Sequence, residues 1–220
     1  MALLHKTQSE IPQDAVKLTE EQAVIYFTRL VEKWDNKWEI WPLEYTPGIL
    51  GATTVVSSVY INHHFRTKLK LGTFGRLSSY VPAVILPAIM STFFHKFFIV
   101  PRIILNRRQC PVCIQTRAGM IQAGFSTVYP MLLAPMSAFM FATRHFTFRL
   151  PSITEQPREV LKLYQKLSRP ITMAVTIMLA FNMLLSMFLT SKEFESVHRI
   201  NLKLMQIEKD LDAESWDKSF

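Results

Sequence analysis

The sequence lacks the residue patterns on which most enzyme chemistry depends. It has only two cysteines and six glycines, and the glycines form no phosphate-binding loop. No Ser-His-Asp set and no pair of catalytic carboxylates can be assembled from it. The cysteine pair has no second pair and no nearby histidine, so a four-ligand zinc site cannot be completed. The sequence therefore predicts no enzyme, no metal site and no cofactor.

The first residues also lack the features of a targeting signal. Residues 1–13 contain no long apolar stretch like that of a secretory signal peptide. They also lack the arginine-rich, acid-poor character of a transit peptide. We therefore expect internal helices to direct insertion into a membrane.

Formal charge is missing from four long windows, at 51–64, 77–95, 118–142 and 170–191. About 20 helical residues cross the ~30 Å hydrocarbon core, where a charge costs about 2.5–3.5 kcal/mol. Buried helices of soluble proteins are normally shorter and amphipathic, so these windows favour a membrane. We predict an all-α membrane protein, a four-transmembrane-helix bundle with helices at about 45–65, 77–100, 118–142 and 170–190.

The positive charge lies between these windows. The net charge is +8, and the basic residues gather in the three connections while both tails are net acidic. This arrangement predicts a lipid bilayer with anionic headgroups as the partner, and no nucleic acid. The first and third connections hold ten Lys and Arg residues and the second holds four, so the first and third are expected on the inner side.

An amphipathic segment flanks each end of the predicted bundle, and both could bind a partner. Thr19 and Gln22 form a capping-box pattern at the start of the first segment, and Pro42 is expected to end it. Its stripe is Val24, Phe27, Val31, Trp34, Trp38 and Trp41, which would lie in the membrane interface or on a partner protein. The predicted parts are an N-terminal tail (1–44), the membrane domain (45–190), and a C-terminal amphipathic helix with an acidic tail (191–220).

Two predicted crossings carry proline pairs, Pro82 with Pro87 and Pro130 with Pro135. Such prolines either kink packed helices or break them to build a transporter or channel site. Since the four windows contain no acid, we favour kinked packing and keep the small transporter or channel as an alternative. His95, near one window's end, is expected to snorkel toward the interface.

Small and hydroxyl residues mark two faces on which helices could meet closely. Such faces support helix association in lipid, either with an incoming subunit or within the bundle itself. The candidates are Gly48, Gly51, Ala52, Thr54, Ser57 and Ser58 on the first predicted crossing, and Gly119 and Gly124 on the third.

The pair Cys110 and Cys113 has the spacing of a redox disulfide. The nearby Arg107, Arg108 and Arg117 would favour thiolates. A thioredoxin-like role expects a βαβ context, which is absent here. A structural disulfide, two free thiols and a thiol redox function all remain open.

The string RQCPVCIQTRAGM, followed by Tyr129-Pro130 and Pro135, resembles the transmembrane protein 126 family. Cys110, Cys113, Thr116, Arg117 and Gly119 match the family's Cys-x-x-Cys-x-x-Thr-Arg-x-Gly element. The resemblance covers roughly residues 45–195. It implies a multi-pass protein of the mitochondrial inner membrane that assists assembly of respiratory complex I without catalysis. The implied partners are complex I membrane-arm subunits and other assembly factors. The count of basic residues in the connections, in turn, favours the matrix for the first and third connections and the intermembrane space for the tails and cysteines.

Overall fold

The computed structural model describes residues 18–105, 110–148 and 157–217, and these ranges are helical with no strand. The α-helices are α1 (Glu20–Glu32), α2 (Lys37–Lys68), α3 (Arg76–Tyr80), α4 (Leu86–Phe94), α5 (Val100–Ile104), α6 (Pro111–Ala123), α7 (Tyr129–His145), α8 (Pro157–Ser168) and α9 (Thr172–Asp217). Three π-helical turns (Val81–Ile85, His95–Ile99 and Gly124–Val128) and a 3-10 turn (Arg169–Ile171) join several of them. The prediction of an all-α protein is confirmed.

Three continuous helical runs in the described part are long and apolar enough to cross a membrane. They are Arg76–Ile104, Pro111–His145 and Arg158–Leu211. These runs contain the predicted crossings at 77–100, 118–142 and 170–190. Helix α2 has 32 residues and contains the predicted crossing at 45–65, but it is not among the sufficiently apolar helices. The fourth crossing therefore stays a prediction.

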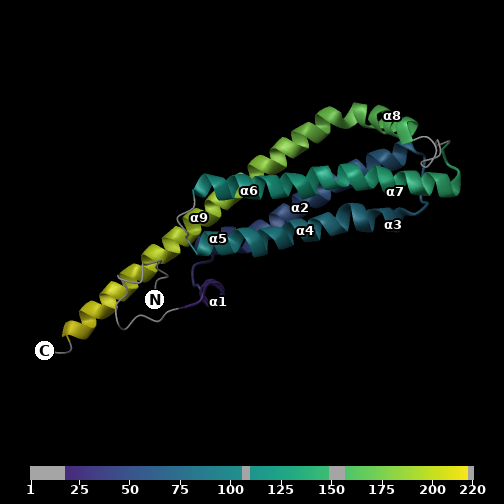
Figure 1. The fold of residues 1–220 in the computed structure, drawn as a ribbon. Coiled ribbons are helices and arrows are strands. Elements are labelled where there is room, and N and C mark those ends of the chain that lie inside the picture. Colours follow the sequence, from purple (N-terminus) through teal and green to yellow (C-terminus); the bar gives the residue numbers. More distant parts are fainter. Residues whose placement is uncertain (1–17, 106–109, 149–156, 218–220) are drawn as a thin grey trace.

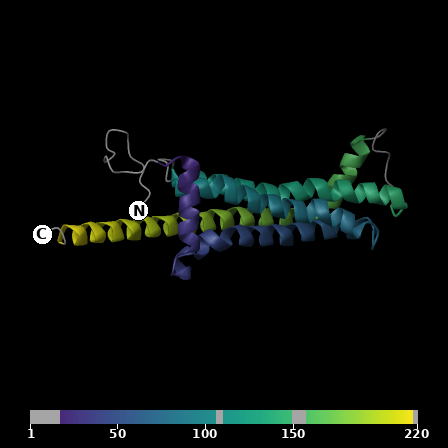
Figure 2. The same ribbon diagram turned by 90° about the horizontal axis from the view of Figure 1, so that it is seen from below.

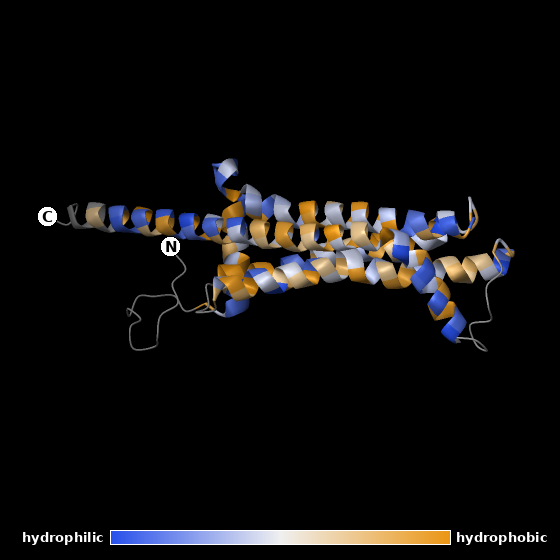
Figure 3. Ribbon diagram, turned by 90° about the horizontal axis from the view of Figure 1, so that it is seen from above, coloured by the Kyte–Doolittle hydropathy of each residue, from blue (hydrophilic) through white to orange (hydrophobic). Residues whose placement is uncertain are grey.

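The long helices lie side by side in one bundle (Figure 1). Helix α2 packs on α4, α7 and α9, and α6 packs on α9. Helix α1 lies across one end of the bundle, and α9 continues past that end (Figure 2). Hydrophilic residues are more frequent on this extension of α9 than along the bundle (Figure 3). The chain therefore has a bundle end with α1 and the α9 extension, and an opposite end with the α2–α3 connection.

Prolines account for the three π turns. Each turn ends two residues before a proline, which is Pro87, Pro101 or Pro130. The residue between the turn and the proline donates its N–H to the carbonyl five residues earlier: Leu86 to Val81, Val100 to His95 and Tyr129 to Gly124. A proline has no N–H for the carbonyl four residues back, and its ring crowds that carbonyl, so the wider turn relieves both problems. The distortion expected at the proline pairs is thus a π turn before Pro87 and Pro130.

The N-terminal tryptophan stripe does not lie on one helix. Helix α1 begins with the predicted capping box of Thr19 and Gln22 but ends at Glu32. Helix α2 begins at Lys37, where the side chain of Asn36 accepts a hydrogen bond from the Trp38 amide at 3.2 Å. The prediction that Pro42 ends a helix is wrong, because Pro42 lies inside α2. The carbonyl that it leaves without an amide partner belongs to Trp38, in the exposed first turn, where solvent can bind it.

The last membrane helix and the C-terminal amphipathic helix are a single helix. Helix α9 runs for 46 residues, or about 69 Å at 1.5 Å per residue. The helix continues unbroken through the predicted boundary at 190, which stays a prediction. Val197, Ile200 and Leu204 of α9 are buried against Phe27 of α1 and other apolar residues, so this part of α9 completes the bundle end. The end of the acidic tail, at 218–220, lies outside the described residues.

Candidate functional site

Most of the predicted partner-binding face on α2 is used inside the bundle. Gly51, Thr54, Ser57 and Ser58 are buried, whereas Gly48 and Ala52 are exposed. A Cβ added at Gly51 would lie 2.6 Å from Oγ1 of Thr92 on α4. Gly51 therefore allows α2 and α4 to approach closely, and only Gly48 and Ala52 remain open to a partner.

The second small-residue face is divided in the same way. A Cβ at Gly119 would lie 3.0 Å from Cγ of Met187 and 3.2 Å from the Met183 carbonyl on α9. A Cβ at Gly124 would meet nothing within 4 Å. Gly119 thus serves the packing of α6 on α9, while Gly124 is free of this constraint.

A buried polar network, which we call the Gln122 network, joins four helices at the centre of the bundle. Nε2 of Gln122 on α6 donates to the Leu50 carbonyl at 3.0 Å and to Thr54 Oγ1 at 3.1 Å, both on α2. Its Oε1 accepts a hydrogen bond from Ser91 of α4 at 2.5 Å. Asn182 of α9 lies 3.4 Å from Gln122 Nε2 and donates to Ser57 Oγ at 3.0 Å. Thr54 and Ser57, two of the polar side chains that make α2 less apolar, are thus bonded within the bundle.

A buried pair of ionisable side chains joins the run that contains α4 to α9. Nε2 of His95 lies 3.0 Å from each carboxylate oxygen of Glu193. His95 is 2% exposed and Glu193 is 0% exposed. The prediction that His95 snorkels toward the interface is wrong, because its ring points inward to a carboxylate. No sequence pattern singled out Glu193, which lies just after the last uncharged window and resembles an ordinary solvated charge there.

A buried arginine organises the opposite end of the bundle. Arg66 of α2 donates to the carbonyls of Gly72 and Phe74 at 2.9 Å, to that of Gly75 at 3.3 Å, and to Ser79 Oγ at 2.7 Å. Gly72 and Gly75 have φ values of +52° and +57°, which suit glycine. The α2–α3 connection therefore wraps around one guanidinium and is held by it.

The three N-terminal tryptophans have different surroundings. Nε1 of Trp34 donates to Oε2 of Glu39 at 3.1 Å, and Glu39 also pairs with Lys203 of α9 at 2.5 Å. Trp41 is half-buried on α2, whereas Trp38 is 85% exposed. Trp34 thus helps to fix the start of α2 to α9, and Trp38 is the ring that remains open to lipid headgroups or to a partner.

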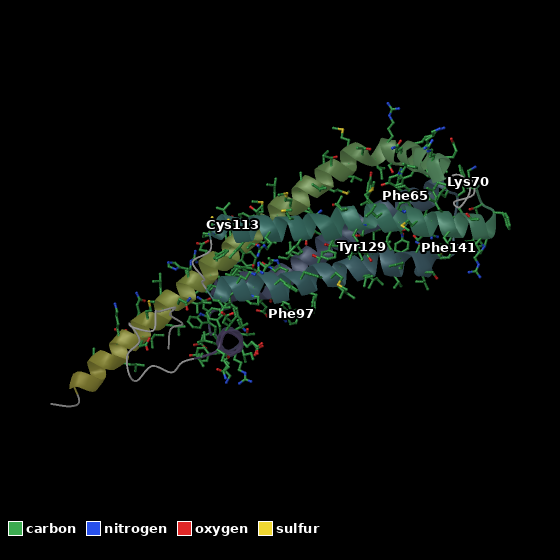
Figure 4. The ribbon with its side chains drawn as sticks, viewed as in Figure 1. Phe65, Lys70, Phe97, Cys113, Tyr129 and Phe141 are labelled. Carbon is green, nitrogen blue, oxygen red and sulfur yellow. The ribbon has the colours of Figure 1, made fainter. Side chains whose placement is uncertain are left out.

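The two cysteines lie at the beginning of α6, where Cys110 is the N-cap and Cys113 is in the first turn. Both are free and exposed, and the Cys113 amide donates to the Cys110 carbonyl at 3.0 Å. Hydrogen bonds from the Cys113 amide, the Cys113 thiol and the Val112 amide lower the pKa of the Cys110 thiol. Figure 4 labels Cys113 at this end of α6. In the described ranges, no three His, Cys, Asp or Glu side chains are placed to hold a metal ion.

Helix α9 exposes an apolar stripe along its membrane portion. The stripe consists of Met173, Ile177, Phe181, Leu184 and Phe188, which are 57–77% exposed. Only 17% of the most apolar window of this run is buried, against 39% and 44% in the other two runs. The first half of α9 is therefore attached to the bundle by one side and offers most of its surface outward. From sequence alone these residues could not be told apart from core residues.

The helical bundle and its three long apolar runs define an integral membrane protein with several candidate spans. The family model described as Transmembrane protein 126 matches residues 28–207. A Drosophila melanogaster protein called Transmembrane protein 126 is 47% identical over 215 residues, covering 97% of this chain and 96% of its own. The chain therefore belongs to the transmembrane protein 126 family, and the resemblance is confirmed. No solved structure matches it.

Proposed function

We propose that this chain is a non-enzymatic scaffold or chaperone of the mitochondrial inner membrane that assists assembly of respiratory complex I. It would bind membrane-arm subunits or assembly intermediates together with other assembly factors. Membership of the family supports this role, because resemblance to that family implies it.

The exposed stripe of α9 is the observation that carries the proposal. A membrane scaffold must present helix surface that its own bundle does not cover, and this stripe is such a surface. Because lipid tails are as apolar as leucine side chains, helices associate in a membrane through close packing and polar contacts. Gly48 and Ala52 offer a second, smaller surface of the small-xxx-small type on α2.

We further propose that α2 is the fourth crossing. Its polar side chains Thr54 and Ser57 are bonded inside the bundle, so they need not meet lipid. Four crossings put both tails and the cysteines on one side. The excess of basic residues in the first and third connections then favours the matrix for those connections and the intermembrane space for the tails.

A small transporter is the second candidate function, and Glu193 is the observation that favours it. Ionisable residues buried in membrane helices often mark ion or proton pathways. However, both oxygens of Glu193 face His95, and this mutual pairing also suits a purely structural role. A flux of protons or small anions into proteoliposomes that Glu193→Gln abolishes would favour transport over scaffolding.

Native pull-down from mitochondria after gentle detergent solubilisation, followed by mass spectrometry, tests the scaffold role. We expect membrane-arm subunits and assembly factors to co-purify with the natural chain. The double variant Phe181→Ala/Leu184→Ala should lose about tenfold or more of this material, because truncating anchor side chains commonly costs over 1 kcal/mol each.

The matched control is Met136→Ala/Met140→Ala, which truncates two similarly exposed side chains on α7. It should retain the partners, because these residues lie outside the α9 stripe. A folded natural chain that elutes alone would overturn the assembly role. Equal loss of co-purifying partners in both double variants would overturn the assignment of the partner-binding surface to α9.

A further inference from the structure

We propose that Cys110 and Cys113 form a redox-active dithiol that exchanges with a small external disulfide of the glutathione class and closes to an intramolecular disulfide. This activity goes beyond the scaffold role and does not depend on it. The pair is the only cysteine pair in the chain, and both thiols are free and exposed in the described part of the structure.

The backbone brings the two thiols together. Cys110 has non-helical backbone angles, φ −54° and ψ 120°, just before the first turn of α6. The hydrogen bond from the Cys113 amide to the Cys110 carbonyl closes this turn, and each thiol is near enough to the other to shift its pKa. A disulfide between them would therefore close within one turn, without moving either cysteine to another element.

The surroundings favour attack by Cys110. Its thiol lies at the N-terminal end of a helical run of 35 residues, where the helix dipole stabilises negative charge. Amide and thiol hydrogen bonds lower the pKa of this group. Arg117, four residues after Cys113 and exposed on the same side of the helix, adds positive charge nearby. Because both cysteines are exposed, a small disulfide can reach them.

The exchange balances without any further reactant. The Cys110 thiolate attacks one sulfur of oxidised glutathione, whose S–S bond breaks, and one glutathione leaves as a thiolate that takes up a proton. Cys113 then loses its proton and attacks the Cys110 sulfur of this mixed disulfide, which releases the second glutathione. One dithiol and one glutathione disulfide thus become one protein disulfide and two glutathione thiols.

The test uses the purified full-length chain in detergent, incubated in buffers of increasing oxidised-to-reduced glutathione ratio. Free thiols are trapped with a maleimide and counted from the intact mass. We expect both labels to disappear together in one transition, with no lasting glutathione adduct. Persistence of both labels in every buffer, or a disulfide between two copies in place of the internal one, would overturn the proposal.

Two single variants examine the order of attack. Cys113→Ser should accumulate a glutathione adduct on Cys110, because the resolving thiol is absent. Cys110→Ser should form its adduct at least about tenfold more slowly, since Cys113 lacks the N-cap position. Equal rates in the two variants, with helix content unchanged by circular dichroism, would overturn the assignment of Cys110 as the attacking thiol. The double variant Cys110→Ser/Cys113→Ser should still retain its partners in the pull-down, which separates this site from the scaffold role.

Discussion

Removing one partner of the His95–Glu193 pair should destabilise the bundle far more than removing both. Both side chains are almost fully buried, and they contact each other through two 3.0 Å distances. His95→Leu would leave the carboxylate buried without its partner. Loss of one member of a buried pair costs about 3–5 kcal/mol. We expect about 3 kcal/mol, at the low end, because a buried carboxylate without a partner can bind a proton.

The double variant His95→Leu/Glu193→Leu removes the unpaired group as well. Apolar replacement of a whole buried ion pair is often neutral or stabilising. The pair lies beside an apolar cluster that includes Ile99 and Val197, each one turn further along the same helix, so two leucines would have apolar neighbours. We therefore expect the free energy of unfolding of the double variant to lie within about 1 kcal/mol of that of the natural chain. The coupling energy between residues 95 and 193 is then about 2 kcal/mol or more.

Unfolding by SDS in mixed micelles, followed by fluorescence of the four tryptophans and by circular dichroism, measures these free energies. Glu193→Gln is the conservative variant, and it should fall between the natural chain and His95→Leu because its amide still bonds the ring. If the separately measured costs of His95→Leu and Glu193→Leu simply add up to the cost of the double variant, a direct interaction is refuted. A cost below about 1 kcal/mol for His95→Leu would refute the burial argument itself.

Three further predictions use the same unfolding assay. Arg66→Ala should cost about 3 kcal/mol, because three carbonyls and Ser79 lose a charged donor, and Arg66→Lys should recover only part of this. Gln122→Leu should cost about 1–2 kcal/mol, since hydrogen bonds between membrane helices are individually weak; no change would mean that the Gln122 network is dispensable. Gly72→Ala should lower the free energy of unfolding by only about 1 kcal/mol, because of its positive φ. Gly75→Ala should lower it clearly more, because a Cβ at Gly75 would also lie 2.7 Å from the Phe141 ring.

The apolar runs could be predicted from sequence because lipid imposes a strong, local rule on charge. The crossings at 77–100 and 118–142 lie within Arg76–Ile104 and Pro111–His145, and the capping box at Thr19 forms as expected. Both features depend on residues close together in the chain. Neither requires knowledge of which helices become neighbours.

Most of the features that the sequence did not predict depend on neighbours distant in sequence. Burial of Glu193 requires His95, which is 98 residues away, and the inward position of Gln122 requires α2, which is about 70 residues away. The small residues on α2 could not be divided between inside and outside without knowing that Thr92 packs on Gly51. Pro42 was misjudged for a local reason, because the carbonyl that it leaves free lies in an exposed first turn.

Helix α9 differs from the other two long runs in a way that bears on how a partner would be held. Those runs contain prolines and π turns, whereas α9 has neither proline nor glycine along its 46 residues. Asn182 and Glu193 make polar contacts that hold it in the bundle, Val197, Ile200 and Leu204 add buried apolar contacts, and the extension beyond them carries exposed Ile207 and Leu211. An unbroken helix fixed in its middle keeps its membrane stripe and its extension at a constant separation and angle. A subunit that contacts both surfaces would therefore have to match their separation and direction as well as their packing. Two separate helices joined by a flexible connection could not select a partner in this way.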